Sequence, residues 1–280
     1  MSLFTVEIEK TYRRWRTYIG FAVILAAVLL LEVIIKLNEP QMSRAFSGGL
    51  NADFLISGHI LNAWVITAFI MNSLYIHVPF LIALVAGDMV SSEATSGTLR
   101  FMLIRPPSRT KIISAKFLAM LFYTASLIVF FGILSVGLGL IFFGGGDLVK
   151  FQPGLPHIVV LPAHIAASRT GMAFLAAILS MSVVGSLAFL FSTLADNSIG
   201  PIIGSIAVVI ISFILGNLPF EFTESLRPYL FTTYMGIWQL LLDNPIQWSI
   251  VGKYALALLG YDTVFFGIAY YVFVRKDIKS

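Results

Sequence analysis

The sequence of 280 residues contains no cysteine and few charged residues. Without cysteine, the chain can form no disulfide, thiol redox centre or cysteine-ligated metal site. Charged side chains make up 11% of the chain, whereas a soluble domain usually carries about 25%. With a mean hydropathy of +0.92, this shortage argues against a surface that faces water and indicates one that faces lipid.

Patterns for nucleotide binding and catalysis are also missing. The chain has no Gly-x-x-x-x-Gly-Lys-Ser/Thr phosphate loop, and the run Gly144-Gly145-Gly146 lacks the lysine that would follow it. The four histidines are too scattered to supply three or four metal ligands. We therefore expect no catalytic residue, no metal and no cofactor in this chain, which is not an enzyme by itself. The net charge of +4 is assigned to loops beside a membrane, and no nucleic-acid partner is expected.

Long apolar stretches take the place of these motifs. A helix needs roughly 20 apolar residues to cross the hydrocarbon core, and the pattern predicts an all-α polytopic membrane protein, with residues 1–280 as a single transmembrane domain. The predicted spans are about 17–36, 61–86, 113–143, 170–194, 200–218 and 251–274. The aromatic, semi-apolar stretch 219–250 is predicted as an outer segment that can re-enter the membrane.

Basic residues predict the orientation. If both termini lie on one side, that side carries 12 of the 18 lysines and arginines. Because cytoplasmic loops are enriched in these residues, we expect both termini in the cytoplasm, in agreement with an even number of spans.

The first sixteen residues predict an amphipathic helix at the membrane surface. Apolar residues recur at helical spacing, and basic residues fill the other faces. The stripe consists of Phe4, Ile8, Tyr12, Trp15 and Ile19. The residues expected at the membrane interface are Tyr12, Arg13, Arg14, Trp15 and Arg16. The alternative is an ordinary cytoplasmic extension of the first span.

The cytoplasmic loop 87–112 is longer than a simple connection between two spans requires. Gly97 interrupts any helix that leaves the second span, and Thr98 can cap a short apolar helix that Pro106 ends. That helix, Thr98 to Ile104, contains Leu99, Arg100, Phe101, Met102, Leu103 and Ile104. It can either pack beneath its own membrane domain or dock into a groove on a partner.

Three stretches of the sequence carry recognisable motifs. The loop carries Glu93, Gly97-Thr98-Leu99, Pro106, Ser108-Arg109 and Lys116. The end of the fourth span reads Ser192-Thr193-Leu194-Ala195-Asp196-Asn197-Ser198, and the last stretch is Phe273-Val274-Arg275-Lys276-Asp277-Ile278. The loop resembles the signature of the type-2 ATP-binding-cassette (ABC) exporter permeases. The second stretch is similar to that family's serine-and-asparagine turn between spans four and five, and the third to its basic-acidic ending. Six spans with an amphipathic start fit the whole chain.

The resemblance implies a function. Segment 98–104 would be the coupling helix, seated on a separate ABC ATPase subunit that holds ATP and magnesium, and segment 1–16 would be the elbow helix. The ATPase-coupling residues would be Glu93, Gly97, Thr98, Leu99, Arg100, Phe101, Met102, Leu103, Pro106 and Arg109. A second permease copy or a sister permease would complete the exporter, in a plasma membrane, expected to be the prokaryotic cytoplasmic (inner) membrane. The alternatives are a gradient-driven secondary transporter and a non-transporting membrane scaffold coupled to an ATPase.

Three ionisable residues of the predicted spans stand out, because charge inside a membrane is costly and therefore suggests function. Asp262 lies near the middle of its span; it can bond serine or tyrosine of a neighbouring helix, or lie at a dimer seam or pathway. Glu32 can pair with Lys36 one turn on. His77 precedes Pro79, which is expected to kink the second span, and can satisfy freed backbone there.

Overall fold

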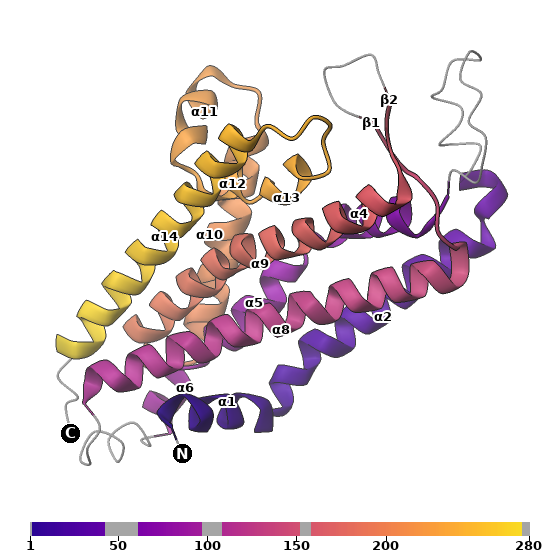
Figure 1. Cartoon of the computed structure of the whole chain (residues 1–280). Helices are drawn as coiled ribbons and strands as arrows, with labels where there is room; N and C mark the ends of the chain where they lie inside the picture. Colours follow the sequence, from indigo (N-terminus) through magenta and orange to yellow (C-terminus); the bar gives the residue numbers. More distant parts are fainter. Residues whose placement is uncertain (1, 43–60, 97–107, 152–157, 276–280) are drawn as a thin grey trace.

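The computed structural model describes residues 2–42, 61–96, 108–151 and 158–275 as a bundle of long helices (Figure 1). Within these residues, six helical runs are long and apolar enough to cross a membrane. They are Trp15–Leu37 (α2), Val78–Thr95 (containing α5, Val78–Ala86, and α6, Ser91–Thr95), Arg109–Phe143 (α8), Ala163–Leu194 (α9), Ile199–Asn217 (α10) and Trp248–Arg275 (α14). The prediction of six membrane-spanning helices is thereby confirmed.

Segment 97–107 lies outside the described residues. The predicted short helix Thr98 to Ile104 falls within it. So do the proposed coupling residues Gly97, Thr98, Leu99, Arg100, Phe101, Met102, Leu103 and Pro106.

The second predicted span, 61–86, was wrong as one continuous helix. The structure has α4 (Ala63–Leu74) and α5, separated by Tyr75 to His77, and α4 is too short to count as a span. Asn62 caps α4, since its side-chain oxygen accepts from the backbone N–H groups of Trp64 and Val65. His77 Nδ1 lies 3.1 Å from the carbonyl oxygen of Ser73, so its ring serves the backbone at this break, in line with the structural interpretation of His77.

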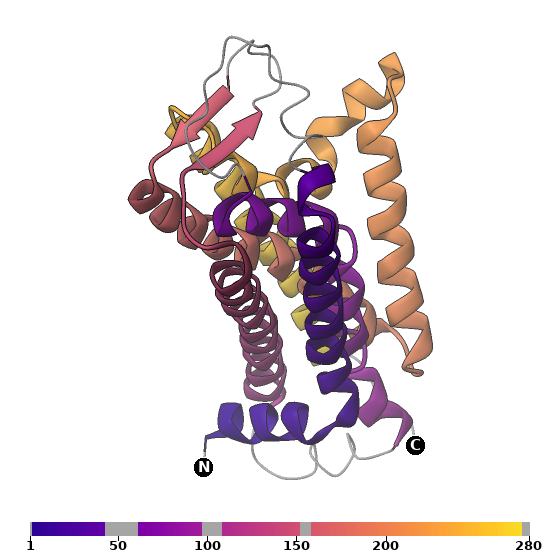
Figure 2. The same ribbon diagram turned by 90° about the vertical axis from the view of Figure 1, so that its right-hand side faces the viewer.

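The N-terminal residues form a helix of their own, α1 (Leu3–Arg13). Arg14 adopts an extended conformation with ψ of 129°, so α1 and α2 are two helices. Figure 2 shows α1 lying across the end of the bundle, at a steep angle to the long helices. The predicted continuous stripe is therefore wrong beyond Tyr12, and Trp15 is 72% exposed. The buried residues of α1 are two polar ones, Glu7 and Thr11.

The opposite end of the bundle carries short elements. Strands β1 (Leu148–Phe151) and β2 (Ile158–Leu161) pair antiparallel, with Leu148 opposite Leu161, so the chain is not purely α-helical. Segment 219–250 consists of short helices (Figure 1). They are α11 (Glu221–Leu226), η1 (Arg227–Tyr229), α12 (Phe231–Tyr234) and α13 (Ile237–Leu240).

Helix α9 is the centre of the packing. It contacts α5, α8, α10, α13 and α14, and its second half is buried almost without interruption from Ser180 to Leu190. Small residues permit this close approach. A Cβ on Gly185 would come within 2.4 Å of Met120 Sδ of α8.

Two glycines of α8 provide a matched test of this packing. A Cβ on Gly139 would lie 3.2 Å from the Cα of Ala63 in α4, whereas one on Gly137 would meet nothing within 4 Å. We expect Gly139→Leu to destabilise the protein by about 1–3 kcal/mol through overpacking, and Gly137→Leu to have no such effect. Thermal unfolding of both variants in detergent measures the difference. Equal unfolding temperatures for the two would contradict the observed contact between α4 and α8.

Candidate functional site

A buried lysine organises the end of the bundle where α1 lies. Lys116 of α8 is 2% exposed, and its Nζ lies 2.8 Å from Glu7 Oε2 of α1 and 2.7 Å from Glu93 Oε1 of α6. It also donates to the carbonyl oxygen of Met89 at 3.5 Å. An ammonium group of this burial is stable only when paired, so one cation joins three helices that are distant in sequence.

Lys10 completes the cluster from the solvent side. Its Nζ lies 3.1 Å from Glu7 Oε1 and 3.4 Å from Glu93 Oε1. Burial by itself would raise the pKa of Glu7, but the attraction and hydrogen bonds of Lys116 and Lys10 outweigh it and lower the pKa below 4.5. Burial would lower the pKa of Lys10, but Glu93 and Glu7 raise it above 10.5. Glu7 and Lys10 are therefore both charged at neutral pH, as partners of opposite sign.

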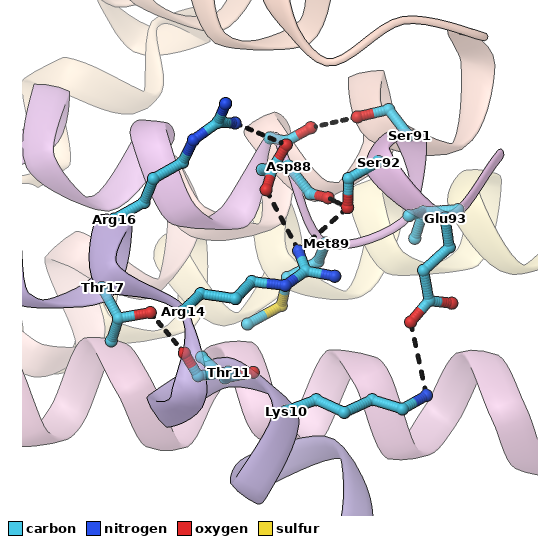
Figure 3. A network of polar contacts seen from close by, with 12 residues as sticks. Lys10, Thr11, Arg14, Arg16, Thr17, Asp88, Met89, Ser91, Ser92 and Glu93 are labelled. Carbon is cyan, nitrogen blue, oxygen red and sulfur yellow. Dashed lines mark hydrogen bonds and ion pairs between the residues drawn. The ribbon is translucent and has the colours of Figure 1, made fainter. Parts of the chain in front are cut away.

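A second group of ion pairs fixes the bend between α1 and α2. Asp88, buried in the turn after α5, binds Arg14 Nη1 at 3.0 Å and Arg16 Nη1 at 3.1 Å. Arg14 also donates to Ser92 Oγ at 2.9 Å. Figure 3 shows both arginines reaching Asp88, and Lys10 reaching Glu93. These two arginines, predicted to lie at the membrane interface, also bind a carboxylate of the bundle.

Helix α6 is also attached to α9. Ser192 Oγ accepts from the backbone N–H groups of Val90 at 3.0 Å and Ser91 at 2.9 Å. Thr95 Oγ1 donates to the carbonyl oxygen of Asp196 at 3.0 Å. At the other border of segment 97–107, Arg109 Nη1 donates to the carbonyl oxygen of Val274 at 3.0 Å. Residues on both sides of that segment are therefore fixed to the bundle.

The three stretches that carry the family resemblance converge here. Glu93 and Lys116 form an ion pair, the turn after α9 contacts α6, and Val274 accepts from Arg109. We name the charged side chains at this end the ionic cluster. It comprises Glu7, Lys10, Arg14, Arg16, Asp88, Glu93 and Lys116.

The remaining interface residues lie at the edge of the cluster. Tyr12 packs edge-on against Phe122, and its hydroxyl group hydrogen-bonds Ser126 Oγ of α8. Arg13 is exposed and pairs with Glu9 on its own helix at 2.6 Å.

Sequence reasoning missed three members of the cluster, Glu7, Lys10 and Asp88, and it named Lys116 as a motif residue without assigning it to the site. A signal existed for Lys116, because it lies in an apolar helix without an acidic residue. Such a lysine requires a carboxylate from elsewhere in the fold. The identity of that carboxylate depends on the position of α1. The hydrophobic spacing of α1 predicted that its apolar face makes the contacts, and so it did not indicate Glu7 as a partner.

Asp262 of α14 lies between two serines of α9. Ser182 Oγ and Ser186 Oγ each donate to one of its carboxylate oxygens at 2.6 Å. Asp262 was predicted either to bond a neighbouring helix or to lie at a dimer seam or pathway. The observed contacts are those of the first interpretation.

Glu32 of α2 has no such partner. It is 0% exposed, and neither carboxylate oxygen has a hydrogen-bond partner among the described residues. The expected pair with Lys36 is wrong, because Lys36 Nζ binds Glu39 at 2.8 Å and lies over the Phe143 ring. A buried carboxyl group without a partner is costly, which makes Glu32 a candidate functional residue.

In the part of the chain that the structure describes, no group of three or more histidine, aspartate or glutamate side chains lies close enough together to hold a metal ion. At the α1 end, paired charges from separate helices can hold a bent segment in one position.

The helices and the ionic cluster define an α-helical multi-pass membrane protein. The chain belongs to the family described as "Protein of unknown function (DUF2705)", whose model matches residues 23–279. It is also similar to "Uncharacterized protein YhcI" of Bacillus subtilis (strain 168), with 26% identity over 207 residues. The match covers 70% of this chain and 63% of that relative, so the chain spans less than two thirds of the relative's length.

Loss of the buried cation tests the cluster. In Lys116→Met, the carboxylates of Glu7 and Glu93 lose their closest partner, and we expect destabilisation by about 3–5 kcal/mol. In the control Arg13→Met, which removes an exposed pair, the loss should stay below about 1 kcal/mol. Thermal unfolding of the purified variants measures both. Equal losses in the two variants would show that burial of Lys116 contributes nothing.

The pH dependence of stability follows from the shifted pKa values. Because the pKa of Glu7 is lowered on folding, its contribution is present above pH 4.5 and is lost as pH falls below that value. Because the pKa of Lys10 is raised on folding, its contribution is present below pH 10.5 and is lost as pH rises further.

Glu7→Gln should therefore flatten the acid side of the unfolding temperature against pH, and Lys10→Met should flatten the alkaline side. Each variant serves as the control for the other. Wild-type slopes on both sides in both variants would mean that neither group is coupled to folding.

Proposed function

We propose that this chain is the membrane-spanning permease subunit of an ABC exporter, which couples substrate export to ATP hydrolysis by a separate ATPase subunit. The observation that carries the proposal is the position of the ionic cluster. Through Glu93 and Lys116, it joins the two helices that flank segment 97–107, where the resemblance puts the coupling helix, and links them to α1. Hydrogen bonds of Ser192 and Arg109 attach the same borders to α9 and α14.

The proposed mechanism is mechanical. A displacement applied to segment 97–107 by the ATPase would reach α6 and α8 directly through the chain. Because Lys116 joins α8 to Glu93 and Glu7, α1 would follow the same displacement as part of one rigid body. The Arg14–Asp88 and Arg16–Asp88 pairs would carry it to the start of α2.

The complex would contain two ATPase subunits and two permeases, either two copies of this chain or this chain with a sister permease. Both ends of the chain and the ionic cluster would face the cytoplasm, where ATP is available, in a prokaryotic inner membrane. The polar contacts of α1 with the bundle support its role as the elbow helix beside the membrane surface.

A gradient-driven secondary transporter is the second candidate, favoured by one observation. Glu32, near the end of α2, is a buried carboxyl group without a hydrogen-bond partner among the described residues, and such groups can carry protons. If transport collapses when a proton ionophore is added while ATP is still present, and Glu32→Gln abolishes it, this candidate replaces the first.

The experiment for the ABC proposal is isolation of the tagged chain from its native membranes, with measurement of ATP hydrolysis by the complex. We expect an ATPase subunit to accompany the wild-type chain in equal amount. Leu99→Glu and Leu103→Glu should each lose it while the permease stays inserted, because a charge would disrupt an apolar helix held in a groove.

Ile199→Glu is the matched control, since Ile199 is an exposed apolar residue near the cluster, at the start of α10. It should retain the ATPase. Isolation of the wild-type chain without an ATP-hydrolysing subunit would refute the proposal. Unchanged ATPase content and activity in Leu99→Glu and Leu103→Glu would refute the assignment of the coupling helix.

A further inference from the structure

A cavity of about 430 Å³ lies at the end of the bundle opposite the ionic cluster. Its volume is within the range of small-molecule sites, about 300–1,000 Å³. The wall is contributed by the α4–α5 break, α10, and the short helices η1, α12 and α13, and includes Tyr75, Phe213, Asn217, Arg227, Thr232 and Gln239.

Arg227 is the charged residue of this wall, and its guanidinium group is poorly paired. No carboxylate forms an ion pair with it among the described residues, although Glu221 and Glu224 lie within two helical turns in the sequence. Its Nε is buried without a hydrogen-bond partner, and one Nη donates to the carbonyl oxygen of Leu218 at a long 3.4 Å. A guanidinium group has five N–H donors, and among the described residues one of them has a hydrogen-bond partner.

The other polar groups of the wall are held in place by the protein. Thr232 Oγ1 hydrogen-bonds Ser212 Oγ at 3.1 Å, Asn217 Nδ2 donates to the carbonyl oxygen of Phe213 at 2.8 Å, and Gln239 Nε2 donates to Asn72 Oδ1 at 3.2 Å. The backbone of Arg227 is fixed as well, since its carbonyl oxygen accepts from Thr233 Oγ1 at 2.7 Å.

One side of the wall is aromatic. Tyr75 packs edge-on against Phe213 and lies beside Trp238, with ring centroids 5.5 and 6.1 Å away. The cavity therefore offers a cation with free donors on one side and an apolar surface on the other.

We propose that this cavity binds the phosphate or carboxylate group of an anionic ligand through Arg227. The fork of the guanidinium group matches either anion with two parallel hydrogen bonds, and a cation without a counter-ion in a cavity favours negative charge. This inference rests on the proposed function only in one respect: in the exporter, the anion would belong to the cargo. The anion can be part of a lipid head group or a free ion in solution.

The test uses the full chain, purified without an ATPase and placed in phosphatidylcholine nanodiscs. Binding of dioctanoyl phosphatidic acid, dioctanoylglycerol and inorganic phosphate is measured by native mass spectrometry and by competition. We expect phosphatidic acid to bind and dioctanoylglycerol, which lacks the phosphate, not to. If millimolar phosphate competes with phosphatidic acid, the site accepts the free ion. If phosphate does not compete, the site requires the lipid.

Arg227→Gln should weaken binding of phosphatidic acid at least about tenfold. Arg227→Lys, which keeps the charge and loses the fork, should weaken it less. Lys253→Gln is the matched control, because it removes an exposed positive charge from the first turns of α14, outside the cavity wall, and it should bind as the wild type does.

Wild-type affinity in Arg227→Gln would overturn the proposal, as would equal binding of phosphatidic acid and dioctanoylglycerol by the wild-type chain. The second comparison needs no variant, so it decides even if Arg227→Gln fails to fold. Since no ATPase is present, failure here leaves the exporter proposal intact, and failure of the exporter proposal leaves this result intact.

Discussion

The ammonium group of Lys116 lies between two carboxylates inside the protein, and the position of three helices depends on it. Glu7 comes from α1, Glu93 from α6 and Lys116 from α8, and without Lys116 the two buried carboxylates would lose their closest counter-ion. The arrangement contributes less to net stability than its short distances suggest, because all three charged groups lose their hydration when they are buried. It does give α1 one specific position on the bundle. An apolar face alone would allow α1 to slide along the bundle.

The opposite ends of the molecule differ in construction. At the α1 end, an ion pair and a hydrogen bond attach the two borders of segment 97–107 to the bundle. The other end consists of a β-hairpin and short helices around a cavity with a poorly paired arginine. A permease that receives force at one end and handles an anionic cargo at the other would use both features.

Hydrophobic runs predicted the membrane-spanning helices, because their length is a property of the local sequence. They did not predict the break at Tyr75 to His77, which lies within one apolar stretch, although Pro79 indicated a kink next to it. They also did not predict the pairing of β1 with β2, because it depends on contacts between two strands. The motif residues Glu93, Arg109 and Lys116 were recognised from the sequence. Lys116 binds Glu7, and Arg109 binds Val274. In each pair the two residues are more than a hundred positions apart in the sequence, and local periodicity does not predict such a contact.

The central claim is that Lys116 holds α1 on the bundle. Since the chain contains no cysteine, Thr11→Cys places a single thiol on the buried face of α1, and its rate of labelling by a maleimide reports how often that face opens. The account predicts slow labelling in the otherwise native chain and labelling more than about tenfold faster when Lys116→Met is added, while the exposed Thr5→Cys labels equally in both backgrounds. Equal slow labelling of Thr11→Cys with and without Lys116 would contradict it.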